Sequence, residues 1–196
     1  MAKLYYKYGA MGSSKSAQAL MTKFNYEEKD RRVWLIKPAV DNRGDARAIT
    51  SRVGLRAEAD VILPDDDLFD KFMGSCGGFA DVIIADEAQF FTPAQIDALR
   101  RIVDELDIPV LCFGLRTDFR TVGFPGSIRL FELADSITEI KTICACGRKA
   151  IVNARRGPDG NITVTGEQVF IGGNESYEAM CHKCWKEKIR QQRERA

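Results

Sequence analysis

Runs of apolar residues alternate with helix-forming stretches along the N-terminal two thirds of the chain. Residues 3–8 alternate in polarity and are rich in β-forming aromatic side chains, so a strand is predicted there. The later apolar runs at residues 32–36, 81–85 and 109–113 are too short for helices and are predicted to be strands as well. The pattern therefore predicts a sheet whose strands lie far apart along the sequence.

Helical patterns separate these strands. Residues 17–24 contain helix formers and no helix breaker. Residues 93–106 place apolar side chains on one helical face and begin with Pro93, which suits the first turn of a helix. Buried strands that alternate with amphipathic helices indicate an α/β fold, with a parallel sheet covered by helices on both faces. Ligands bind such sheets beyond the carboxyl ends of the strands.

The segment after the first strand, residues 9–16, reads Gly-Ala-Met-Gly-Ser-Ser-Lys-Ser and resembles a phosphate-binding loop. Free N–H groups and the positive end of the following helix would attract phosphates there. Lys15 would reach the β- and γ-phosphates, and the hydroxyl of Ser16 would bind magnesium. The fold class predicted is therefore P-loop NTPase-like, or RecA-like. The alternative is a purely structural feature, a turn of small residues that caps a helix.

Ser14 stands where the loop pattern requires glycine. If the backbone there has a positive φ, serine strains the loop; if φ is negative, serine costs little. The sequence leaves both possibilities open.

Asp86 and Glu87 follow directly after the strand predicted at residues 81–85. In P-loop proteins a carboxylate at this place holds the magnesium shell opposite the loop serine, and a neighbouring glutamate can accept a proton. The alternative is that these two residues are only an exposed acidic end of a strand. Residues 89–91 and 113–119 add aromatic and amide side chains near the same edge, where aromatic faces suit a flat base and the Gln89 amide could read its edge.

The character of the chain changes after about residue 140, so we predict a nucleotide-binding domain over residues 1–140 and a smaller lobe over residues 141–196. In the lobe, two β-like runs at residues 150–156 and 161–165 flank Gly-Pro-Asp-Gly, which predicts a hairpin. The polar, arginine-rich residues 41–60 in the first domain are predicted to be a loop.

Four of the six cysteines form two pairs that bracket the predicted hairpin, as in a zinc ribbon: Cys144, Cys146, Cys181 and Cys184. The first pair has one residue between its members where two are usual, so Cys144 is the less certain ligand and His182 the substitute. A closed site of four ligands would be structural. Cys76 and Cys112 are isolated and are interpreted as plain thiols.

The composition is that of a folded protein with little net charge. The chain has 196 residues, 45% of them hydrophobic, and a formal net charge of +1. This charge argues against bulk binding to nucleic acid. The basic bias of residues 183–195 is read as a solvated helix or tail. We expect no signal peptide and no membrane span, and a cytoplasmic location.

Taken together, these segments resemble the zinc-containing, P-loop type of thymidine kinase, and the resemblance extends over nearly the whole chain. It rests on residues 9–16, 41–43, 86–91, 114–120 and 171–177 and on the paired cysteines. It implies that Glu87 is the general base for the 5′-hydroxyl of thymidine, with deoxyuridine as a second acceptor. Ser16 and Asp86 would organise magnesium, with Asp41 contributing through water, while Arg43 would approach the transferring group.

The resemblance also implies two sets of binding residues. The donor nucleotide ATP and its metal would be bound by Gly9, Ala10, Met11, Gly12, Ser13, Ser14, Lys15, Ser16, Asp41, Arg43, Asp86 and Gln89. The thymidine pocket, with the loop that closes over it, would be formed by Met11, Phe90, Leu115, Phe119, Phe124, Phe170, Ile171, Gly172, Gly173, Asn174 and Tyr177. A structural zinc ion would hold that loop at its base. A homotetramer and feedback inhibition by thymidine triphosphate are further implications.

Two rival functions fit parts of the pattern. The first is a P-loop ATPase that acts on nucleic acid through the cysteine lobe, against which the near-neutral charge counts. The second is an inactive nucleotide-binding module disabled by Ser14, against which the retention of Lys15, Ser16, Asp86 and Glu87 counts. Loss of ATP that depends on thymidine would separate a kinase from both.

Overall fold

A central parallel sheet organises the larger part of the protein in the computed structural model, which describes residues 1–41, 47–169 and 176–195. Its strands are β1 (Leu4–Tyr8), β2 (Val33–Pro38), β5 (Asp60–Ile62), β6 (Val82–Ala85), β7 (Val110–Gly114) and β8 (Ser136–Glu139). They are hydrogen-bonded in the order β5-β2-β6-β7-β1-β8, and every pairing is parallel. The four strands predicted from the apolar runs are confirmed as β1, β2, β6 and β7, with shifts of one or two residues at their ends.

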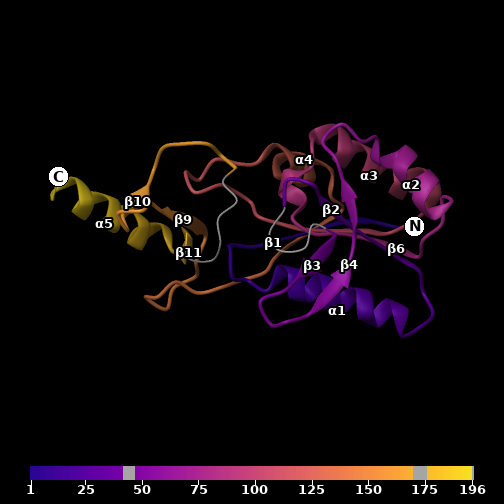
Figure 1. Cartoon of the computed structure of the whole chain (residues 1–196), viewed down its shortest axis with the longest axis horizontal. Helices are drawn as coiled ribbons and strands as arrows, with labels where there is room; N and C mark the ends of the chain where they lie inside the picture. The colour runs from indigo at the N-terminus through magenta and orange to yellow at the C-terminus, as the bar shows by residue number, and fades with distance from the viewer. Residues whose placement is uncertain (42–46, 170–175, 196) are drawn as a thin grey trace.

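Helices cover both faces of this sheet (Figure 1). One face carries α1 (Lys15–Glu27); the other carries α2 (Leu68–Cys76), α3 (Pro93–Leu106) and α4 (Pro125–Leu133). The alternation of side chains along β6 explains this arrangement: Ile83 and Ala85 join the core on one face, and Val82 and Ile84 join the core on the other. A strand buried on both sides has to be apolar throughout, as this one is.

The α3 helix begins and ends where the sequence predicts. Thr92 caps it by accepting a hydrogen bond from the N–H of Gln95, whose side chain in turn accepts from the N–H of Thr92. Pro93 occupies the first helical turn. This reciprocal cap satisfies two backbone donors at the end nearest to the strand-end carboxylates.

The prediction of a loop over residues 41–60 is wrong for much of the described part. A short antiparallel hairpin of β3 (Ala48–Thr50) and β4 (Arg56–Glu58) lies beside α1, and β5 already begins at Asp60. Ile49 of this hairpin is buried in the core beneath α1. The strands escaped notice because each has three residues and β4 is largely exposed, so neither shows an apolar alternation.

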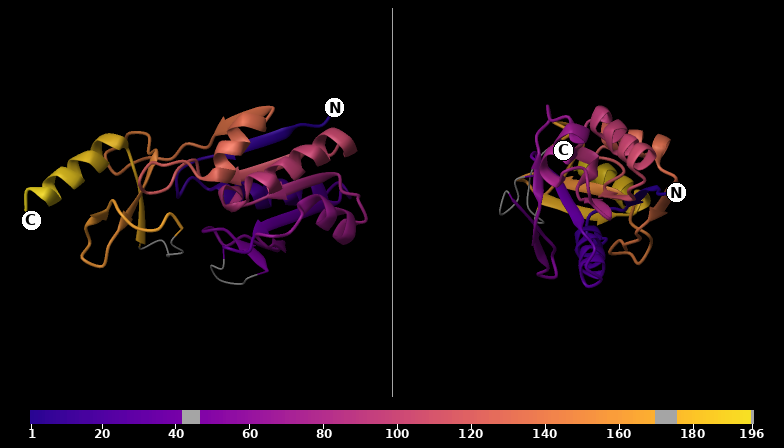
Figure 2. Two further views of the ribbon diagram at one scale, coloured as in Figure 1. Left: turned by 90° about the horizontal axis from the view of Figure 1, so that it is seen from above. Right: turned by 90° about the vertical axis from the view of Figure 1, so that its right-hand side faces the viewer.

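A small lobe with its own core lies at the end of the molecule opposite the N-terminus (Figure 2). It contains a sheet in the order β10-β9-β11, made of β9 (Val152–Arg156), β10 (Ile162–Thr163) and β11 (Tyr177–Met180), followed by α5 (His182–Arg193). The antiparallel pairing of β9 with β10 confirms the predicted hairpin. Among the helices of the described chain, none has the length and apolarity needed to cross a bilayer.

Candidate active site

The phosphate loop joins β1 to α1 at the carboxyl edge of the sheet and is packed closely against its surroundings. The N–H of Gly9 donates to the carbonyl of Gly114 at 3.2 Å. A Cβ added at Gly9 would lie 2.3 Å from the carbonyl oxygen of Ile140, so only glycine fits there. The loop therefore has a fixed position between two strand ends.

Lys15 lies inside this loop. Its side chain is buried, and its Nζ donates to the carbonyls of Gly9 and Ala10 at 3.1 and 3.0 Å and to the hydroxyl of Ser13 at 3.3 Å. The loop oxygens thus surround the ammonium group at the beginning of α1, where the helix dipole adds further positive potential. This is the arrangement that suits a bound polyphosphate.

The backbone of Ser14 has φ 62° and ψ 26°, which is the left-handed conformation. The sequence left the sign of φ open, and the positive value means that serine strains the loop. Ser14 is also the N-cap residue of α1, yet its side chain makes no capping hydrogen bond. The strain at this position is therefore not offset by a cap.

Asp86 provides a buried carboxylate next to the loop. Burial, and after it the charge of Glu87, raise its pKa to about 7, although a hydrogen bond with Ser16 acts in the opposite direction. Its Oδ1 is buried and has no hydrogen-bond partner within the described parts of the chain. An orphaned carboxylate oxygen next to a serine hydroxyl is a donor set that fits a hard divalent cation such as magnesium.

Glu87 follows Asp86 and lies in the same cavity. Its backbone is left-handed, with φ 49° and ψ 37°, at the start of the 3-10 turn η1 (Ala88–Phe90). The amide of the buried Gln89 donates to the Glu87 carboxylate, and its Oε1 accepts from the N–H of Leu115 at 2.9 Å. Both ends of the Gln89 amide are therefore engaged, between Glu87 and the Leu115 backbone. That Gln89 binds the donor nucleotide stays a prediction.

The backbone at Leu115 is fixed as well. Its carbonyl accepts from the hydroxyls of Tyr6 at 2.7 Å and Ser127 at 2.6 Å. A Cβ added at Gly114 would lie 2.8 Å from Oε1 of Gln89, so the preceding residue has to be glycine for this network to form. The network therefore fixes the position of the Glu87 carboxylate relative to the backbone of Leu115.

A cavity of about 430 Å³ lies between these groups. The predicted site residues that line it are Met11, Gly12, Ser14, Lys15, Ser16, Asp41, Asp86, Glu87, Gln89, Phe90, Leu115, Phe119, Phe124 and Tyr177. Phe90 and Phe124 meet edge to face with ring centroids 5.6 Å apart, which gives part of the cavity an aromatic wall. The cavity volume falls in the usual range of ligand sites.

The other residues predicted to bind ATP or thymidine are not among the described residues that line the cavity. Gly9, Ala10 and Ser13 belong to the loop but do not line the cavity, and their oxygens accept hydrogen bonds from Lys15. Arg43, Phe170, Ile171, Gly172, Gly173 and Asn174 lie outside the described residues. Asp41, by contrast, does line the cavity, and its carboxylate is 3.3 Å from the Nζ of the buried Lys37.

Sequence reasoning missed the residues by which the lobe touches the site. On β9, Asn153 accepts from the N–H of Met11 at 2.7 Å and donates to the carbonyl of Thr117 at 2.9 Å. Two residues later, the Arg155 guanidinium lies 3.7 Å from the ring centroid of Phe119. Their spacing puts both on one face of the strand, and a strand prediction with polar residues at alternate positions could have revealed them.

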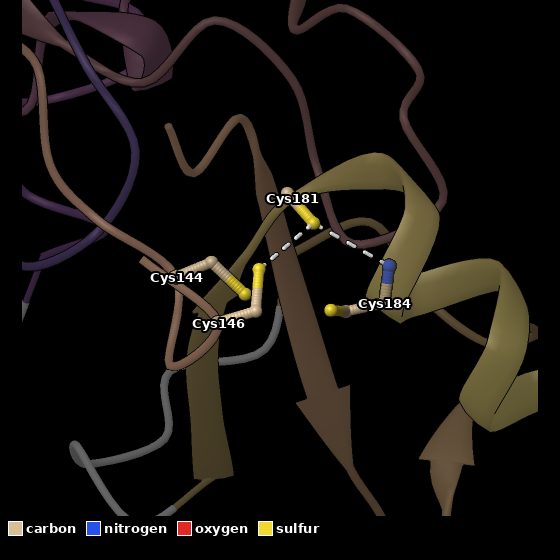
Figure 3. A group of neighbouring side chains, drawn as sticks. All are labelled: Cys144, Cys146, Cys181 and Cys184. Atoms are coloured by element: carbon tan, nitrogen blue, oxygen red, sulfur yellow. Dashed lines mark hydrogen bonds between the residues drawn. The ribbon is translucent and has the colours of Figure 1, made fainter. Parts of the chain in front are cut away.

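The four paired cysteines converge in the lobe (Figure 3). Their sulfur atoms lie within 4.8 Å of one another, and those of Cys146 and Cys181 are 3.6 Å apart. Four thiolates around a tetrahedral zinc ion would be about 3.8 Å apart, given the usual zinc–sulfur distance of about 2.3 Å. The donor set and spacing therefore fit a structural zinc ion.

The structure places Cys144 within this cluster and His182 outside it. Burial raises the pKa of the Cys144 thiol, but hydrogen bonds from the backbone of Cys146 and Cys181 and from the Cys146 and Cys184 side chains together outweigh burial and bring the pKa to about 7. His182 is exposed, and its ring lies 5.5 Å from that of Trp185. Cys144 therefore completes the set despite the short spacing of its pair.

Comparison of the sequence with known proteins identifies one family. The family model described as thymidine kinase matches residues 2–185. A thymidine kinase of Ruegeria pomeroyi is 45% identical over 95% of both chains. One of Legionella pneumophila is 46% identical over 95% of this chain and 90% of its own length. One of Chromobacterium violaceum is 46% identical over 94% of this chain and 98% of its own length. The chain belongs to the thymidine kinase family.

Proposed function

We propose that the protein is a thymidine kinase, which transfers the γ-phosphoryl group of ATP to the 5′-hydroxyl of thymidine. The observation that carries this proposal is a single cavity lined by the phosphate loop, by aromatic side chains and by Glu87. A phosphoryl transfer of this kind needs two ligands held in line more than it needs covalent help from the protein. The family membership agrees with this reading.

Glu87 is the proposed general base. Its carboxylate accepts the proton of the 5′-hydroxyl as that oxygen bonds to the γ-phosphorus and the bond to the ADP leaving group breaks. Gln89 acts as a positioning residue, because its amide donates to the Glu87 carboxylate and is itself held by Leu115. A carboxylate oriented in this way has less freedom to lose in the transition state.

The phosphate loop and Lys15 would hold the donor phosphates. Ser16 and Asp86 would hold magnesium, with Asp41 contributing through water. When bound, that ion neutralises charge on the phosphates. The orphaned Oδ1 of Asp86 supports this assignment. Arg43 is proposed to approach the transferring group.

The aromatic wall would bind the thymine base. Phe90, Phe124 and Phe119 offer flat apolar surfaces, and the buried Phe119 carries the Arg155 guanidinium on its face. The segment from Phe170 to Tyr177 is proposed to close over the base and to bind its edge through main-chain groups. The amide of Gln168 bonds to the side chain of Asp118 and the carbonyl of Gly123, each at 3.3 Å, which supports a fixed base for that segment.

Several properties of the molecule as a whole belong to the same proposal. Zinc on the four cysteines is structural, and the chain divides into residues 1–140 and 141–196. The active protein is a cytoplasmic homotetramer, inhibited by thymidine triphosphate as its end product. A near-neutral chain has little electrostatic attraction for nucleic acid, so DNA is not expected to stimulate turnover.

The test is phosphate transfer from magnesium-ATP to thymidine by the purified zinc-loaded protein, with Glu87→Gln as the matched variant. We expect thymidine monophosphate from the wild type and turnover lower by about a hundredfold or more in the variant, with thymidine binding kept. Near-normal turnover in Glu87→Gln would remove that residue from the base role. Folded protein that binds ATP but forms no product would instead identify an inactive binding module.

A further inference from the structure

The β3–β4 hairpin presents a rigid turn to the cavity. The N–H of Ser51 donates to the carbonyl of Leu55 at 2.8 Å, and the Ser51 hydroxyl accepts from the N–H of Leu55 at 3.0 Å. Gly54 has a φ of +85° and donates to the carbonyl of Ser51 at 3.1 Å. Ser51 itself is buried. The turn that carries Arg52 and Val53 therefore has a defined shape.

The same hairpin is anchored to the body of the domain. Ile49 is buried in the core that α1 forms with the sheet. The carbonyl of Ala48 accepts from the buried Nζ of Lys37 on β2 at 3.2 Å. These contacts hold the hairpin against the body of the domain, and residues 48–53 all line the cavity.

Arg52 lies at this turn, and its guanidinium is next to Gly12 of the phosphate loop. A Cβ added at Gly12 would be 3.4 Å from its Nη1, which places the guanidinium next to the loop backbone. Within the described parts of the chain, Arg52 has no ion pair and no hydrogen bond. By contrast, Arg100, Arg120 and Arg129 each pair with a carboxylate.

We propose that Arg52, next to Gly12 of the loop, binds the polyphosphate of the nucleotide donor together with the loop amides and Lys15; this deepens the proposed function and rests on it. A guanidinium presents several N–H donors in a fixed fork that matches phosphate oxygens. Lys15 is buried within the loop, whereas Arg52 is exposed at the mouth of the cavity. The two cations thus contact the same polyphosphate, and no role for Arg52 in the base pocket is required.

The experiment compares Arg52→Ala and Arg52→Lys with the wild type by calorimetric titration of magnesium-ATP, without thymidine. Arg190→Ala on α5 is the matched control, because it also removes one exposed arginine but lies in the lobe, away from the cavity lining. We expect Arg52→Ala to weaken ATP binding by about ten- to a hundredfold, the usual range for hydrogen bonds to charged groups. Arg52→Lys should fall between, since it keeps the charge and loses the fork.

Thymidine and adenosine titrations supply the second readout. Loss of a phosphate contact leaves the affinity for both nucleosides within about twofold of the wild type. An ATP affinity unchanged in Arg52→Ala, or equal losses for ATP and thymidine, would overturn the proposal, the second because it indicates a distorted hairpin. The titration with ATP needs no turnover, so it can succeed or fail independently of the assay for thymidine monophosphate.

Discussion

Replacing Ser14 by glycine should stabilise the protein, because Ser14 holds a left-handed backbone with φ 62° and gains no cap from its side chain. A side chain with a Cβ costs roughly 1–2 kcal/mol in that conformation. Glycine removes this cost but gives the unfolded chain more freedom, which costs roughly 0.4–1 kcal/mol. The net gain is about 0.5–1 kcal/mol in the free energy of unfolding.

Calorimetric or fluorescence-detected thermal unfolding of the zinc-loaded protein without nucleotide measures this effect. For a chain of this size, the gain corresponds to a rise in Tm of about 1–4 °C. Asp30→Gly is the matched variant, since Asp30 has a φ of 55° at an exposed position after α1. Ser75→Gly supplies the opposite sign, because Ser75 is exposed within α2 and glycine destabilises a helix.

A Tm for Ser14→Gly equal to or below that of the wild type, while Asp30→Gly raises the Tm, would refute the strain argument.

The Ser14→Gly variant also tests whether the strained backbone affects the binding of one ligand or of both. Because Ser14 lies in the loop that would hold the donor phosphates, its substitution should change the affinity for ATP more than the affinity for thymidine. Equal shifts for both ligands would contradict a local effect.

Three further outcomes are expected. The pKa of Asp86 is raised to about 7 from an ordinary value of 3.8, so the folded state holds more protons than the unfolded state between these values. The zinc-loaded protein without magnesium should therefore lose stability as pH rises from 4 to 7. Asp86→Asn should flatten that slope in urea unfolding followed by fluorescence. Asn153→Ala leaves the N–H of Met11 without its acceptor, which costs roughly 1–3 kcal/mol, so the KM for ATP should rise in steady-state kinetics. Removal of zinc by a chelator should melt the lobe, whose core is small, and circular dichroism should report the loss of α5 and the β9 sheet.

The phosphate loop and the strand-end carboxylates could be predicted from the sequence because their signals are local. A glycine-rich turn between a strand and a helix sets the path of the backbone within a few residues. An apolar run that ends in Asp86 and Glu87 likewise fixes where two carboxylates emerge from a buried strand. The alternation of strands and helices then brings both features to the same edge of the sheet.

The hairpin and the lobe contacts could not be found in this way because their stability is not local. The strands β3 and β4 are held by Ile49 in a distant core and by Lys37 on another strand, and neither contact leaves a mark in the hairpin's own residues. Asn153 and Arg155 similarly acquire partners more than thirty residues away. A pattern of polarity can place such residues on a strand face, but only the packing of the two parts decides what that face meets.

The packing of β9 gives the cysteine cluster an influence beyond its own lobe. One face of this strand bonds to the phosphate loop through Asn153 and covers the aromatic wall through Arg155. Arg155 also donates to the carbonyls of Thr165 and Glu167, just before the segment proposed to close over the base. A metal that holds β9 in place therefore supports both halves of the cavity without touching either ligand. Loss of that metal should accordingly weaken ATP and thymidine binding together, whereas substitution of Arg52 should weaken ATP binding alone.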